Sequence, residues 1–194
     1  MLTALLSSGG PDRVSIGELI DCLGDRAFGV LILLCSLPNC IPGPPGVSTI
    51  TGLPILLFAL QLLIGGDRPW LPRSLRDRSF SRADLLGVVR RADPWLRRLE
   101  RLSRPRLPAL VTGWAERAAG FVVFLLAFIL ILPIPLGNLF PAIAIAVIAV
   151  ALMEQDGAAL LVGYVCAVLS MAISFAGLLV ALLILAEVLE RLLG

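Results

Sequence analysis

The chain alternates between long apolar segments and shorter polar ones, and two of the apolar segments are interrupted by proline and glycine. The first runs from Ala27 to Ile64 and the second from Ala118 to Leu152. Proline removes a backbone donor and clashes with the preceding helical turn, so neither a soluble core helix nor an uninterrupted transmembrane helix would carry such breaks. Each segment is therefore predicted to be a re-entrant helical hairpin. The predicted turns contain Pro42, Pro44, Gly46, Pro133, Pro135 and Gly137.

The arms of these hairpins are expected to be short. Ala27 to Leu37 amounts to roughly 17 Å of helix, about half of a hydrocarbon core of about 30 Å. Thr51 to Ile64 has a similar reach. The first turn is therefore expected near the middle of the bilayer, where its backbone must be buried in protein or line a wet cavity.

The two broken segments match one another along their length. An acid and an arginine precede each segment, and the prolines and glycine of the two turns fall at the same offset. We interpret this match as a tandem duplication. The charges before the hairpins are Asp25, Arg26, Glu116 and Arg117. Charges so close to hydrocarbon need a partner or a function, so we expect either crossed ion pairs between the repeats or proton coupling through the two acids.

The whole chain is predicted to be one all-α integral membrane domain with four parts. Residues 11–66 hold an amphipathic helix, capped at Ser15, and the first hairpin; residues 67–115 form a linker; residues 116–156 hold the second hairpin. Residues 157–194 are expected to form two C-terminal transmembrane helices separated by a turn near 174–177. Their small residues would permit close packing and a homodimer: Gly163, Ala167, Ser170, Ala172, Ser174 and Gly177.

The linker is rich in arginine. All 16 basic residues of the chain are arginines, and most of them lie between Asp67 and Arg117, which predicts a cytoplasmic location by the positive-inside rule. Two amphipathic linker helices are expected, one capped by Ser81 and one over 94–102. The arginines have two possible uses, which the sequence leaves open: binding of anionic lipid, or orientation of the chain with ordinary surface solvation.

Composition narrows the function classes. With 58% hydrophobic and 15% charged residues, the chain lies outside the range of soluble proteins, and its first twenty residues are not expected to be a signal peptide. A net charge of +2 is too small to indicate nucleic-acid binding. There is no histidine, and the four cysteines follow no CxxC pattern, so no metal, cofactor or disulfide framework is expected. We also expect no enzyme, because no GxSxG elbow is present.

Paired Pro/Gly-interrupted hydrophobic segments are typical of transporter binding sites. The ends of broken helices leave backbone groups and partial charges that can hold an ion or a polar ligand within the membrane. The candidate ligand contacts are the polar residues near the two turns: Asn39, Ser48, Thr49, Thr51 and Asn138. The alternative is that these side chains only cap the helix ends.

Two stretches carry a resemblance to a known family. GELIDCLGDRAFGVLILLCSLPNCIPGPPGVSTITGLPILLFALQLLIG and ILPIPLGNLFPAIAIAVIAVALMEQDG resemble the ExoD family of bacterial exopolysaccharide-synthesis membrane proteins, over nearly the whole chain. The resemblance implies a bacterial inner-membrane location and a part in exopolysaccharide production, but no catalytic residues. A looser likeness to DedA-type membrane proteins, which also carry facing re-entrant hairpins, is analogy only.

Two functions follow as hypotheses. The first is a transporter-like protein that moves an ion, a proton or a lipid-linked precursor through a site between the hairpin turns. The second is a non-transporting partner of a polysaccharide-synthesis complex, with the arginine-rich helices as its docking surface. The linker holds no segment long and apolar enough to cross, so counted literally both hairpins enter from the cytoplasm. Inverted hairpins would require an amphipathic stretch or an apparent half-helix to span the membrane, and the sequence leaves this open.

Overall fold

The computed structural model describes residues 13–40, 47–66, 68–72, 76, 79–81, 111, 113–132 and 138–193. Within these ranges the chain is helical apart from two paired three-residue strands. The α-helices are α2 (Ile16–Leu23), α3 (Ala27–Ser36), α4 (Val47–Ile64), α7 (Trp114–Ile131), α8 (Leu139–Glu154) and α9 (Gly157–Leu193). Short 3₁₀ turns, η1 (Gly24–Arg26) and η2 (Leu37–Cys40), flank α3. The expected all-helical class is confirmed.

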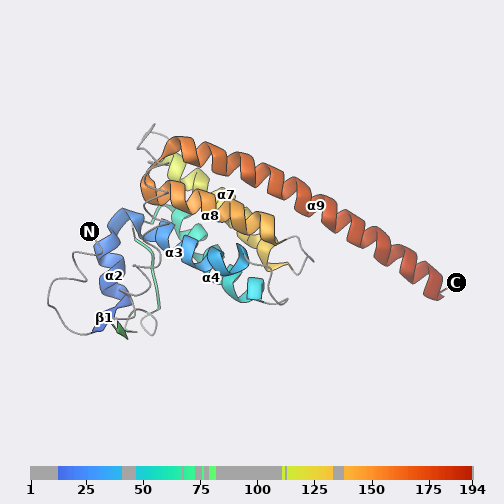
Figure 1. Ribbon diagram of the computed structural model, residues 1–194, viewed down its shortest axis with the longest axis horizontal. Coiled ribbons are helices and arrows are strands. Elements are labelled where there is room, and N and C mark those ends of the chain that lie inside the picture. The colour runs from blue at the N-terminus through green and yellow to red at the C-terminus, as the bar shows by residue number, and fades with distance from the viewer. Residues whose placement is uncertain are drawn as a thin grey trace.

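Four helices form the bundle, and they pack reciprocally (Figure 1). Helix α3 of the first broken segment lies on α8 of the second, and α4 of the first lies on α7 of the second. A glycine stands at each contact. A Cβ at Gly29 would lie 2.7 Å from the carbonyl oxygen of Ala149, and a Cβ at Gly120 would lie 2.7 Å from the amide nitrogen of Leu63. Both helix pairs therefore approach backbone to backbone, which only glycine permits.

Both hairpins open at the same end of the bundle. Gly65, just after α4, meets the guanidinium of Arg117 near the start of α7, and Gly29 near the start of α3 meets Met153 near the end of α8. We call this the open end. At the opposite end, the turn end, the hydroxyl of Thr49 donates to the carbonyl oxygen of Ile131 at 3.3 Å.

The core of the bundle is apolar and continuous. It consists of large side chains that face inward from every bundle helix and from the first half of α9. Those with less than 2% exposure include Ile32, Ile55, Leu62, Val123, Leu126, Leu130, Ile145, Ile148 and Leu160. In contrast, large apolar side chains on the outer faces are exposed, such as Ile50 at 73% and Phe128 at 59%. Exposed apolar surface of this extent is typical of a protein that is surrounded by lipid.

Among the described residues, two helices are long and apolar enough to cross a membrane: α7, and the part of α9 from Gly157 to Val180. Only 33% and 28% of these stretches are buried inside the protein, whereas the core helix of a soluble protein is mostly buried. Together with the composition, these helices indicate a membrane protein.

Helix lengths correct the expectation of half-membrane arms. Helix α3 has 10 residues, as expected for a short arm. Helix α4 has 18 residues because it begins at Val47, whereas the sequence pattern predicted a start at Thr51. Pro54 lies in its interior. Helices α7 and α8 have 18 and 16 residues. Helices of this length reach roughly 24–27 Å, most of a hydrocarbon core.

The C-terminal segment also differs from expectation. Instead of two helices with a turn near 174–177, α9 is one continuous helix of 37 residues, whose later part runs past the bundle (Figure 1). Several of the small residues assigned to a homodimer contact are buried within the chain itself. A Cβ at Gly163 would lie 2.6 Å from the Ile148 side chain, and Ala167, Ser170 and Ser174 are at most 2% exposed. Ala172 and Gly177 remain on the exposed face.

The acidic turn between α8 and α9 is a tight connection. Gln155 adopts a left-handed conformation with φ of 53°, and the Asp156 amide donates to the carbonyl oxygen of Ala151 at 3.0 Å. The Asp156 carboxylate in turn accepts a 2.9 Å hydrogen bond from the amide of Ala158. Asp156 therefore caps α9 and is 3% exposed, so its role here is structural.

Helix α2 lies outside the bundle and begins with the predicted cap (Figure 1). The Ser15 hydroxyl accepts from the Glu18 amide at 3.1 Å, while the Glu18 carboxylate accepts from the Ser15 amide at 3.0 Å, a complete capping box. Strand β1 (Arg13–Ser15) pairs antiparallel with β2 (Ser79–Ser81), which ties α2 to the linker. Ser81 is the last residue of β2, just as the cap Ser15 is the last residue of β1. The linker helices expected beyond it, including the one that Ser81 was predicted to cap, lie outside the described residues.

We expect the Gly120→Ala substitution to destabilise the protein. Its methyl group would meet the backbone of α4, and overpacking of this kind typically costs about 1–3 kcal/mol. Thermal unfolding of the purified protein in detergent measures the effect. Gly177→Ala is the matched control, because nothing lies within 4 Å of a Cβ there; equal stabilities of the two variants would contradict the close approach of α4 and α7.

Single cysteines at Arg68, Arg117 and Gln155 are expected to react with an impermeant thiol reagent from the same side of the membrane. All three positions lie at the open end and have exposed side chains. The measurement is labelling of intact cells and of inverted vesicles, in a variant that lacks the four native cysteines. Labelling of Arg68→Cys and Arg117→Cys from opposite sides would show that the hairpins are inverted.

Candidate functional site

The polar residues predicted as ligand contacts gather at the turn end of the bundle. In the first hairpin, Asn39 of η2 is 7% exposed and faces Thr51 of α4. The Asn39 Nδ2 group donates to the Thr51 hydroxyl at 2.7 Å, and that hydroxyl donates to Asn39 Oδ1 at 3.0 Å. Asn39 Nδ2 also reaches the carbonyl oxygen of Cys35 at 3.3 Å. The pair fixes the distance between the two arms of this hairpin.

A second link joins the two hairpins to one another. The Asn138 Nδ2 group, immediately before α8, donates to the Ser48 hydroxyl of α4 at 2.8 Å. Thr49 adds its bond to the carbonyl oxygen of Ile131, the last residue of α7. That oxygen is among the acceptors that a helix end leaves unsatisfied. The structure thus brings together Asn138 and Ser48, which are 90 positions apart in the sequence.

One atom of this cluster lacks a partner. Asn138 Oδ1 is buried and has no hydrogen-bond partner within the described part of the chain. A buried acceptor without a partner costs about 1–3 kcal/mol, so such an atom is a natural contact for a donor or a cation. The prolines and glycines predicted to form the turns, residues 42–46 and 133–137, lie outside the described residues.

The charges that precede the hairpins lie at the open end, far from this cluster. Arg117 Cζ stands 5.5 Å from the centroid of the Trp114 ring, a cation–π arrangement, and its guanidinium also contacts Gly65. Arg26 is exposed. The Asp25 side chain lies outside the described part, so the crossed pairing of Asp25 with Arg117 and of Glu116 with Arg26 stays a prediction.

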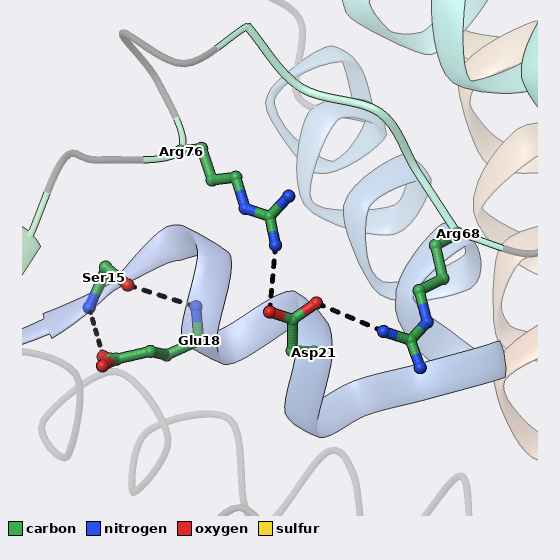
Figure 2. A network of polar contacts seen from close by, with 5 residues as sticks. All are labelled: Ser15, Glu18, Asp21, Arg68 and Arg76. Atoms are coloured by element: carbon green, nitrogen blue, oxygen red, sulfur yellow. Dashed lines mark hydrogen bonds and ion pairs between the residues drawn. The ribbon is translucent and has the colours of Figure 1, made fainter.

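A polar cluster that the sequence analysis did not single out lies beside α2 (Figure 2). Arg76 donates to the Asp21 carboxylate at 3.0 Å, and Arg68 lies 3.6 Å from its other oxygen. The available signal was weak: Asp21 falls on the polar face of an amphipathic helix, and the two arginines were only two among many in the linker. Pairing between segments this far apart leaves no local spacing pattern.

The described residues offer little for metal chemistry. Among them, no group of three His, Cys, Asp or Glu side chains is arranged to hold a metal ion. Cys22, Cys35, Cys40 and Cys166 are free thiols, of which Cys40 contacts the carbonyl oxygen of Ser36 at 3.6 Å. The chemistry available at the turn end is therefore hydrogen bonding through hydroxyl and amide groups.

Comparison with known proteins gives consistent matches. The family model described as "Exopolysaccharide synthesis, ExoD" matches residues 1–176. The chain is 32% identical over 168 residues to Protein ExoD of Rhizobium meliloti, covering 84% of this chain and 70% of that protein. It is 33% identical over 150 residues to an uncharacterised protein of Synechocystis, covering 76% of this chain and 70% of that protein. No solved structure matches the chain significantly.

A double-mutant cycle tests the link between the hairpins. Ser48→Ala and Asn138→Leu are expected to be coupled by about 0.5–1.5 kcal/mol, the contribution of one hydrogen bond between neutral groups. The free energy of unfolding in detergent supplies the four values of the cycle. Arg191→Gln with Ser48→Ala serves as a distant pair and should be additive; additivity of Ser48→Ala with Asn138→Leu would mean that the bond contributes nothing.

Proposed function

The chain belongs to the ExoD family of exopolysaccharide-synthesis proteins, and from this premise we propose a transporter-like role in the bacterial inner membrane. In this role the protein binds an ion, a proton or the polar part of a lipid-linked precursor between its two hairpin turns. Membership of the family supports the connection to exopolysaccharide synthesis, and the polar cluster at the turn end supports the proposed binding site.

The observation that supports this site most directly is the bond between Asn138 and Ser48. It joins the two broken helical segments beside a largely apolar core and leaves the carbonyl oxygen of Asn138 buried without a partner among the described residues. Polar groups at membrane depth are costly unless they are used. A carbonyl oxygen accepts hydrogen bonds and coordinates hard cations, so the proposed ligand presents a cation, an N–H or an O–H group there.

The reciprocal packing of the four bundle helices supports the predicted duplication. If the two hairpins are exchanged, the contact of α3 with α8 becomes the contact of α7 with α4. Because both hairpins open at one end, we propose parallel rather than inverted repeats, related by an axis along the membrane normal. The arginine-rich linker begins at this end, and by the positive-inside rule it is placed in the cytoplasm.

Flux across reconstituted vesicles tests the proposal. We expect the full chain to carry protons, alkali cations or polyprenyl phosphates, measured one at a time, and Asn138→Leu to lower that flux at least about tenfold, as expected for the loss of a polar ligand. Asn138→Ser, which retains a polar group, should retain part of the activity even where Asn138→Leu folds poorly.

Gly177→Ala is the control for reconstitution and should leave the flux unchanged. Absence of flux for every member of this panel would contradict the transporter-like role. The remaining hypothesis would then be that this protein is a non-transporting partner of a polysaccharide-synthesis complex.

A further inference from the structure

A small cavity lies beside α2, at the opposite end of the bundle from the proposed transport site. Its volume is about 130 Å³, and it is lined by Ile20, Asp21, Arg68, Pro69, Leu71 and Arg76. This volume accommodates a phosphate group with several waters but not a large ligand. Three of the lining residues, Ile20, Pro69 and Leu71, are apolar, and the other three place two guanidinium groups on either side of one carboxylate (Figure 2).

Both arginines are held in place by the surrounding fold. Arg76 lies across Gly17, where a Cβ would come within 2.7 Å of its Cγ. Its backbone amide bonds to the carbonyl oxygen of Pro72 at 3.0 Å. The segment that carries Arg68 is fixed by Gln61, whose side chain bonds to both the amide and the carbonyl group of Trp70. The pairing of β1 with β2 holds the linker beside α2 on the other side of Arg76.

The charges at the cavity do not balance. Two guanidinium groups share the single carboxylate of Asp21, which leaves one positive charge in excess among the lining residues. Each guanidinium has five N–H donors, and the bonds to Asp21 use few of them; the 3.6 Å separation of Arg68 Nη1 from Asp21 Oδ1 is too long for a hydrogen bond. The remaining donors match the oxygens of a phosphate group, which arginine binds in pairs.

We propose that this cavity binds a phosphate group, held by Arg68 and Arg76, whose guanidinium groups Asp21 orients. The two sources of that chemistry are the headgroup of an anionic phospholipid and a free phosphate. The surroundings favour the lipid. Trp70, two residues after Arg68, is 65% exposed, and Ile64 is 72% exposed. An exposed tryptophan beside an arginine is typical of the headgroup level of a membrane.

Binding to the full-length protein in detergent tests the proposal. Titration calorimetry is carried out with inorganic phosphate and, separately, with dioctanoyl phosphatidic acid, and dioctanoyl phosphatidylcholine is the lipid without a free phosphate monoester. We expect phosphate-dependent binding that weakens with salt, because both guanidiniums are more than half exposed. Binding of phosphatidic acid alone identifies a lipid site, and binding of inorganic phosphate as well identifies a site for the phosphate group itself.

Two variants connect the binding to this cavity. Arg76→Gln should weaken it about fivefold to tenfold, as expected for the loss of charge-assisted bonds, whereas Arg191→Gln makes the same charge change on α9 and should have no effect. Gly17→Ala leaves the charge unchanged but displaces Arg76, so it should also weaken binding, whereas Gly177→Ala should not. Absence of binding to both phosphate ligands, or equal binding by Arg76→Gln and Arg191→Gln, would overturn the proposal.

Discussion

The close approach of helix backbones at Gly29 and Gly120 is the constraint on which the arrangement of this protein depends. At these two positions a methyl group would meet the backbone of α8 or α4. The two broken segments therefore interlock, with the helices of one packed directly against the helices of the other. Within lipid, association of helices relies on such packing rather than on exclusion of water. The interlocking brings the beginnings of α4 and α8 to one end of the bundle, so that Asn138 reaches Ser48.

The same packing separates two kinds of polar chemistry. At the turn end, uncharged groups bond in pairs, Asn39 to Thr51 and Asn138 to Ser48. At the open end, charged groups of α2 and the linker meet, with Arg117 against Trp114 and Asp21 between two arginines. Charges are tolerated at a membrane surface, and uncharged hydrogen-bonded pairs are tolerated within the membrane. This division fits a membrane protein whose open end lies at the surface.

Local patterns predicted much of this fold. The capping box at Ser15 and Glu18 was predictable because its residues are three positions apart and bond to each other's backbone. The polar side chains near the turns were found because proline and glycine mark where helices end. Their partners could not be assigned, since Ser48 and Asn138 meet only through the packing of α4 on α7 and of α7 on α8.

Local rules were less informative for α9. Its small residues suggested a contact between copies, which stays a prediction, and one of them, Gly163, packs against α8 in the same chain. The turn expected near 174–177 rested on the length that a bilayer accommodates, whereas no proline interrupts α9 and its helix continues. Pro54 lies in the interior of α4, where it removes one backbone hydrogen bond without ending the helix.

The length of α9 fixes where its last turns can be. Its apolar portion of 24 residues extends about 36 Å and fits a 30 Å hydrocarbon layer at a tilt of about 35°, within the range observed for membrane helices. The full 37 residues extend about 55 Å, too far for any ordinary tilt. If α9 crosses a bilayer, the turns that carry Glu187 and Arg191, bonded to each other at 2.6 Å, would therefore lie among headgroups or water on the side opposite Trp70. The charged end of the helix would then extend from the protein on that side.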